Sequence, residues 1–203
     1  GAKYYAKSQK KACAEVGIEY ELHQLAPTST EEDLTAHIAG VDFMRTQCLD
    51  TVDEAVDAVI TTSAGYPLDL TFYQAIKGMT AAQGILKDGG VLIIAAKIAE
   101  GIGSPEFTRL MLETERIEPF LENIKNPEYL VLDQWQFQKF CQVLEKHEVW
   151  LYSDGLDRTV QSHLFVTPLN SVEEGIEKLY ARFGGDFSVA VIPEGPYVLA
   201  GRA

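Results

Sequence analysis

Apolar residues along the chain follow two alternating patterns. Short apolar runs bounded by Gly, Pro and Asp are typical of strands, and stretches with apolar residues three and four positions apart are typical of helices. The runs that predict strands lie near 19–25, 56–62, 91–96, 149–152 and 187–192. Because helical stretches separate them, the sequence predicts an α/β fold. We expect a mainly parallel sheet of about five strands with helices on both faces, a Rossmann-like three-layer sandwich.

The strand at 56–62 is followed by a turn that carries the chain into a helix. The segment 63–67 breaks the apolar run, with Gly65 and Tyr66 at its centre, and a helical pattern starts near Asp69. In open α/β sheets, ligands bind where strands end and helices begin. We therefore expect Gly65 and Tyr66 to lie at a substrate site.

The helix after this turn has an apolar face and a separate polar group. The apolar face follows helical spacing through Phe72, Ala75, Ile76 and Met79. Tyr73, Gln74 and Lys77 lie off that stripe and are neighbours on the helix surface. Either Asp69, or a capping box of Thr71 with Gln74, is expected to cap the first turn. The helix should then present a phenol, an amide and an ammonium to solvent; an ordinary solvated helix face is the alternative interpretation.

The remaining elements follow from local signals. Capping boxes at 29–32 and 171–174 predict helices that run to about 49 and 183, and Asp133 is expected to cap a helix starting at 134. Three further features are expected: a turn at 87–90, a glycine loop at 99–104 and a short strand at 163–166. No internal repeat or linker interrupts this order, so the sequence predicts a single α/β domain over 1–203.

Composition narrows the class of protein. With 203 residues, of which 46% are hydrophobic and 23% charged, the chain can bury a globular core. Its net charge of −13 argues against nucleic acid and anionic membranes as partners, because both require a basic surface. No apolar run reaches the roughly 18 residues of a membrane span. The three cysteines have no CxxC spacing, so we interpret them as buried reduced thiols of a cytoplasmic protein.

Metal and nucleotide signals are weak. The four histidines are scattered along the chain, which predicts no metal site and no cofactor bound by this chain alone. Gly101 and Gly103 follow a strand and precede a helix, but Glu106 stands where a dinucleotide motif needs its third glycine. A flexible turn is therefore the favoured interpretation of this loop.

Lys77 and Gln74 are the strongest candidates for chemistry. A lysine at the edge of a cleft can bind a substrate carboxylate as a point charge, or transfer a proton if burial lowers its pKa. Gln74 can donate and accept hydrogen bonds toward the same small anion. Asp154, just after a strand, is the best-placed acid, although a turn or cap role is the favoured interpretation of it. A module that binds small anions with Gln74, Lys77 and the helix N-terminus is a further alternative.

Six short motifs give residues 39–203 a family resemblance. In chain order they are 39–43 (AGVDF), 63–69 (SAGYPLD), 73–78 (YQAIKG), 88–90 (DGG), 100–104 (EGIGS) and 192–197 (IPEGPY). This set resembles the C-terminal domain of the nickel-dependent lactate racemases. The GYPxD and YQxxKG strings are specific, and the other motifs follow them in the expected order.

The resemblance implies a function for the same residues. In that family, the glutamine and lysine matched by Gln74 and Lys77 face a 2-hydroxy acid substrate, and Tyr73 lies beside them. A nickel-pincer nucleotide, which accepts the hydride, is implied for the full-length family and belongs to an N-terminal domain. That domain is missing here, so the resemblance implies an isomerase fragment, part of a racemase or epimerase, with no activity on its own.

The first 38 residues resemble a different family. Residues 4–5, 11–19, 22–25 and 30–34 are similar to the N-terminal domain of methylenetetrahydrofolate dehydrogenase/cyclohydrolases. Tyr5 matches the tyrosine of that family's YxxxK pair, but Gln9 stands at the lysine position, so folate chemistry is not expected. The two resemblances meet near residue 38. They suggest an engineered chimera, with a helix-strand-helix unit grafted onto an α/β scaffold that has no catalytic activity; a divergent natural racemase relative is the alternative.

Overall fold

The computed structural model describes residues 49–203, which lie within one compact unit, 47–203. Its strands are β1 (Leu49–Val52), β2 (Val56–Thr62), β3 (Leu86–Ala95), β4 (Glu148–Tyr152), β5 (Thr167–Leu169), β6 (Val189–Ile192) and β7 (Leu199–Arg202). Its helices are α3 (Phe72–Ala82), α4 (Pro105–Glu113), α5 (Ile117–Asn123), α6 (Gln134–Leu144), α7 (Arg158–Gln161) and α8 (Val172–Phe183), with short 3-10 helices η1 (Gln83–Ile85) and η2 (Gly195–Tyr197). The expected elements before residue 49, including the strand at 19–25 and the unit at 1–38, lie outside the described residues.

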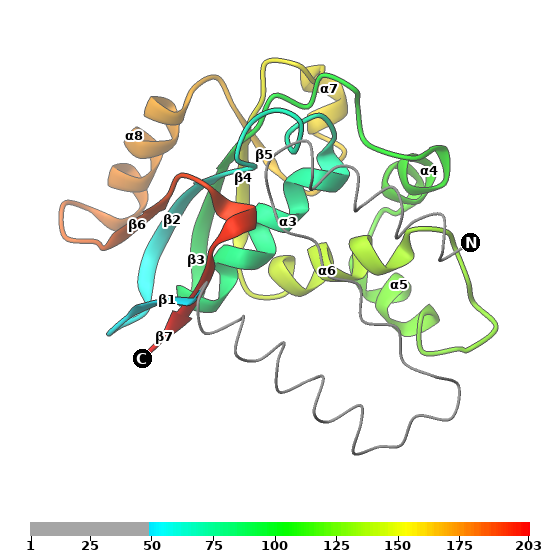
Figure 1. Ribbon diagram of the computed structural model, residues 1–203, viewed down its shortest axis with the longest axis horizontal. Coiled ribbons are helices and arrows are strands. Elements are labelled where there is room, and N and C mark those ends of the chain that lie inside the picture. Colours follow the sequence, from blue (N-terminus) through cyan, green and yellow to red (C-terminus); the bar gives the residue numbers. More distant parts are fainter. Residues whose placement is uncertain (1–48) are drawn as a thin grey trace, which may run out of the picture. The chain divides into compact units, whose positions relative to one another are not determined.

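Five parallel strands form the central sheet, in the order β5-β4-β3-β2-β6 (Figure 1). The expected α/β fold with a parallel sheet is confirmed. The strand expected at 163–166 is wrong: after α7 ends at Gln161 the polypeptide forms a turn there, and the strand begins at Thr167. Strands β1 and β7 pair in parallel as a separate two-stranded sheet that the apolar pattern did not predict.

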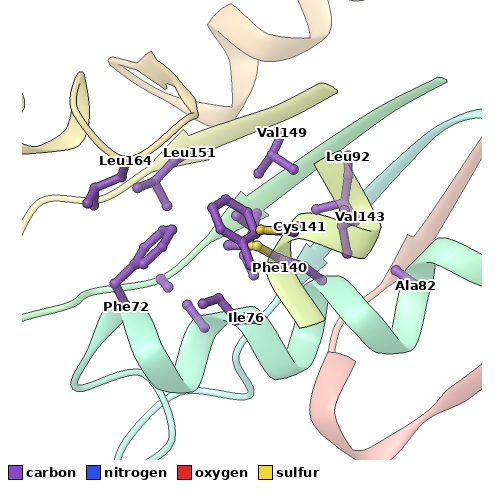
Figure 2. Close-up of a cluster of buried hydrophobic side chains, with 14 of the residues drawn as sticks. Phe72, Ile76, Ala82, Leu92, Phe140, Cys141, Val143, Val149, Leu151 and Leu164 are labelled. Carbon is purple, nitrogen blue, oxygen red and sulfur yellow. The ribbon is translucent and has the colours of Figure 1, made fainter. Parts of the chain in front are cut away.

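Helices cover the sheet on two faces. Helices α3 and α6 pack on one face and α8 packs on the other (Figure 1). Phe72 and Ile76 of α3 meet Phe140 of α6 between α3 and the sheet, and the Phe72 and Phe140 rings lie edge to face with centroids 5.4 Å apart (Figure 2). Burying such side chains stabilises the fold by about 1.5–3 kcal/mol each. The apolar spacing used to predict α3 therefore marks the real core.

The turn expected at 87–90 lies inside β3 as a bulge. Val56 pairs with Leu86, but Ala58 already pairs with Val91, so the four intervening residues loop out of the ladder. Gly89 adopts φ +79°, which glycine reaches without strain. The bulge lets a single strand contain the Asp-Gly-Gly segment that looked like a chain reversal.

Two residues expected from the sequence have more specific roles in the fold. Cys141 of α6 is fully buried as a free thiol, and burial raises its pKa to about 12, as expected for an unreactive core cysteine. Asp133 precedes α6 as expected, but its side chain does not cap the helix. It has φ +64°, and its carboxylate accepts a hydrogen bond from the Ser104 hydroxyl at 2.7 Å instead.

Candidate functional site

A cavity of about 510 Å³ opens at the carboxyl edge of the sheet. Its walls come from the ends of several strands and the segments that follow: Thr62, Ala64, Gly65, Asp69, Ala95, Ala96, Lys97, Tyr152, Asp154, Pro193 and Glu194. Strands β3, β4 and β5 lie on one side of β2, whereas β6 lies on its other side. The cavity is therefore at the switch point where open parallel sheets bind ligands.

The turn from β2 to α3 borders this cavity. Ala64 and Gly65 both have left-handed φ angles, +59° and +71°, and the Tyr66–Pro67 peptide bond is cis. The Ala64 amide donates to the Thr62 hydroxyl at 2.9 Å, which holds the start of the turn against the end of β2. Gly65 lines the cavity, whereas Tyr66 projects into solvent from the same turn.

The N-terminus of α3 is closed by protein groups. The Thr71 hydroxyl accepts from the Gln74 amide at 3.3 Å, so Thr71 rather than Asp69 is the cap. The Phe72 and Tyr73 amides donate to the carbonyls of Gly101 and Ile102, at 3.0 and 2.8 Å. Because these donors are already used, the anion-binding helix terminus considered above is wrong for α3.

Two glycines allow α3 to approach the end of β2 closely. A Cβ added at Gly78 would lie 2.5 Å from the Thr62 carbonyl oxygen, and one at Gly195 would lie 2.5 Å from the same atom. Helix α3, strand β2 and η2 therefore meet at this point, far apart in sequence but packed together. The glycines of the YQAIKG and IPEGPY motifs thus have a physical reason: they fix the position of α3.

The three candidate side chains of α3 differ in exposure. Lys77 is exposed, as expected. Tyr73 is half-buried between the rings of Phe107 and Trp135, with centroids 5.1 and 5.9 Å away. Gln74 is half-buried, and its Oε1 is buried with no hydrogen-bond partner in the described part of the protein. The expectation of three solvent-facing groups therefore holds for Lys77 and is wrong for the other two.

The structure does not place all the candidates around one cavity. None of Tyr73, Gln74 and Lys77 lines the cavity beside Gly65. The cavity instead contains Lys97, whose ammonium lies 3.4 Å from the Asp154 carboxylate. Asp154 was already a candidate acid, but Lys97 was missed; the signal that could have found it is its place directly after the apolar strand.

Metal-binding groups do not gather in residues 49–203. Within that range, no three His, Cys, Asp or Glu side chains are arranged to hold a metal ion. His147 is buried, and that burial lowers its pKa. None of the helices in the described range combines the length and apolar character needed to cross a membrane.

Comparison with models of known protein families identifies the family of this chain. Residues 51–200 match the model of the lactate racemase C-terminal domain. This chain belongs to the lactate racemase C-terminal domain family. The match begins after the proposed grafted unit and covers the β2–α3 turn, α3 and the Gly195 segment.

Two lactate racemases are similar in sequence. The chain is 36% identical to that of Lactiplantibacillus plantarum over 163 residues, which covers 79% of this chain and 38% of the relative. It is 32% identical to that of Thermoanaerobacterium thermosaccharolyticum over 180 residues, covering 87% of this chain and 42% of the relative. The chain thus spans about two-fifths of the length of the curated relatives it matches.

Solved structures show the same fold. The lactate racemase apoprotein of Thermoanaerobacterium thermosaccharolyticum superposes with a TM-score of 0.72 at 33% identity, covering 81% of this chain and 40% of that chain. A Thermotoga maritima protein superposes with a TM-score of 0.56 at 15% identity, covering 85% of this chain and 43% of that one, which concerns the fold alone. The alignment over 87% of the chain extends past the proposed junction near residue 38, so the chimera gains no support from these relatives.

Proposed function

We propose that this chain is the substrate-contacting part of a racemase or epimerase acting on lactate or another small 2-hydroxy acid. It would be inactive alone and would require the N-terminal part, which carries the nickel-pincer nucleotide. The proposal is supported by the match to a C-terminal domain and by the fraction of the relatives that the chain spans. In this proposal, the YQAIKG motif of α3 lies at the interface between this chain and the N-terminal part.

Each candidate residue has a distinct task in this proposal. The exposed ammonium of Lys77 would bind the carboxylate of the hydroxy acid and is the catalytic candidate together with Gln74. Tyr73, held between two aromatic rings, would form an apolar wall beside the substrate. Gly65 and Tyr66 would contribute from the neighbouring turn.

The observation that carries the proposal is the unpartnered oxygen of Gln74. A buried acceptor without a hydrogen bond costs about 1–3 kcal/mol, and such groups require an explanation. Gln74 Oε1 lies one helical turn from Lys77. Rotation of the Gln74 amide toward solvent would let Oε1 accept a hydrogen bond from a hydroxyl of the substrate or of the N-terminal part, and a carboxylate on the same ligand would reach Lys77.

The cofactor cannot be assigned to the described residues. They contain no side-chain cluster able to hold a metal ion, so nickel ligands would come from outside residues 49–203. The task left to residues 49–203 is to bind and orient the hydroxy acid.

The test is a two-part enzyme. The segment of the Thermoanaerobacterium thermosaccharolyticum racemase that precedes the matched region, loaded with its cofactor, is joined to the front of this full chain through a protease-cleavable linker. Lactate racemisation is followed by chiral chromatography. We expect activity from the hybrid, none from the chain alone, and a loss of about 100-fold or more in the Lys77→Ala hybrid.

A matched lysine variant separates a specific effect from a general one. Lys178 lies on α8, on the other face of the sheet, where it pairs with Glu174 at 3.0 Å. The Lys178→Ala hybrid should keep its activity. A folded hybrid with no racemase activity, or equal losses in both lysine variants, contradicts the proposed function.

A further inference from the structure

The segment between α5 and α6, together with the first turn of α6, displays large apolar side chains to solvent. Leu130, Leu132 and Trp135 are 83%, 62% and 52% exposed. Single exposed apolar residues are common, but a group of large ones marks an interaction surface. We call these three residues the apolar ridge.

The ridge is held in place by polar contacts. Gln134 Oε1 accepts from the Val131 amide at 2.7 Å, and the Asp133 carboxylate accepts from the Ser104 hydroxyl at 2.7 Å. Asp133 also keeps a left-handed φ, which costs a non-glycine residue about 1–2 kcal/mol. Val131 packs against the main core between the two exposed leucines. The segment is therefore fixed in a conformation that keeps both leucines outside.

The ridge adjoins Tyr73 of α3. The Trp135 ring lies edge to face with the Tyr73 ring, and the buried Gln136 amide donates to the Tyr73 carbonyl at 2.8 Å. A domain that covers Gln74 and Lys77 would therefore also lie next to the ridge. Val189 and Val191 are also exposed, but they lie on β6, at the edge of the sheet beside β2.

We propose that the apolar ridge is the docking surface for the N-terminal part of the racemase, with an apolar patch of that part covering Leu130 and Leu132. This inference rests on the proposed function. Two observations support the N-terminal part as the partner that covers the ridge. This chain does not span roughly three-fifths of the relatives' length, and the ridge is in contact with Tyr73. Burying two exposed leucines at an interface strengthens association without changing the fold of the free chain.

The cleavable hybrid described above tests this surface. After cleavage at the linker, the association of the two parts is measured by size-exclusion chromatography and by calorimetric titration of the separated parts. In the double variant Leu130→Ser/Leu132→Ser, the dissociation constant should rise by about tenfold or more. The thermal unfolding of the variant chain alone should match that of the unmodified chain, because both side chains are exposed.

The matched control is Val189→Ser/Val191→Ser, which makes the same kind of change on β6 and should leave the dissociation constant within about twofold. Parts that separate after cleavage in the unmodified hybrid overturn the inference. So does an unchanged dissociation constant in the leucine double variant. If the hybrid racemises lactate but its parts associate equally well without the two leucines, the docking surface is refuted and the proposed function stands. If association requires the leucines but the hybrid has no racemase activity, the docking surface stands and the proposed function is refuted.

Discussion

The two faces of the central sheet are covered to different depths. On the α3/α6 face, Phe72, Phe107, Phe137 and Phe140 are fully buried in one continuous core. On the α8 face, a small cluster around Ile93 and Leu179 is the buried part, and Val189 and Val191 of β6 remain exposed. The candidate residues lie on α3, the helix of the deeper face. The larger of the two hydrophobic cores therefore lies between the sheet and α3, the helix that positions the candidate residues.

Truncating the deeper core should have the largest effect. Phe140→Ala removes a ring that packs on Phe72, and we expect it to lower the free energy of unfolding by about 3–5 kcal/mol. Leu179→Ala, in the smaller cluster, should cost about 2–3 kcal/mol because it creates a smaller cavity. Urea denaturation measures both. An equal or larger loss at Leu179 would remove the proposed difference between the faces.

Helical glycines offer a sharper comparison. Replacing a glycine inside a helix by alanine normally stabilises a protein by about 0.5–1 kcal/mol. At Gly78 of α3 the new Cβ would meet the backbone oxygen of Thr62 at 2.5 Å, so Gly78→Ala should instead destabilise by about 1–3 kcal/mol.

Gly175 of α8 is the matched position on the other face. Its Cβ would meet only the terminal methyl groups of Ile93 and Leu169, at 2.8 and 2.9 Å, and these can move aside. We expect Gly175→Ala to change the free energy of unfolding by less than about 1 kcal/mol. If Gly175→Ala were the more damaging substitution, α8 rather than α3 would be the rigidly seated helix.

Acid should weaken the link between β2 and the segment before β6. The Asp57 carboxylate pairs with Lys87 at 2.8 Å and accepts from the Ser188 amide and hydroxyl, and these contacts, led by the Lys87 hydrogen bond, lower its pKa to about 2. A lowered pKa means that folding favours the ionised form. The stabilisation is therefore complete above the ordinary pKa near 3.8 and is lost as pH falls toward 2.

After allowance for solvent screening, this contribution amounts to about 1 kcal/mol. Chemical denaturation at pH 5 and at pH 2.5 measures it. Asp57→Asn should remove this part of the pH dependence, and a variant that loses as much stability between the two pH values as the unmodified chain would show that other carboxylates are responsible.

The smallest effect is expected on the exposed edge of the thinner face. Val191→Thr keeps the branched side chain that suits a strand and replaces a methyl group that is already in water. We expect a change of less than about 0.5 kcal/mol in the free energy of unfolding. A loss above 1 kcal/mol would show that Val191 contributes to a buried surface in solution.

Sequence patterns predicted the elements that bury an apolar face, and they failed where the outcome depends on distant contacts. The spacing of Phe72 and Ile76 sufficed for α3, because a helix of that composition has one way to bury them. The burial of Gln74 and the use of the α3 amides by Gly101 and Ile102 could not be predicted, because the partner loop lies far along the chain.

Strand pairing shows the same limit. Strands β1 and β7 stabilise each other across the sequence from 49 to 202, and neither has a strong apolar pattern of its own. The segment 87–90 was expected to form a turn between elements, but the pairing with β2 on either side of it keeps it within β3. Here the hydrogen-bonded pairing of β2 with β3 on both sides of the bulge outweighs the local preference of the sequence for a turn.

The thiol of Cys141 gives this protein an internal reporter. It is fully enclosed beneath the helices of the deeper face, and its thiolate form is suppressed at neutral pH because its pKa is near 12. An alkylating reagent can modify it only when α6 detaches or the whole unit opens. The rate of alkylation at Cys141, followed by peptide-resolved mass spectrometry, would therefore report how often the native protein opens without denaturant. Binding of a partner over α3 should lower that rate.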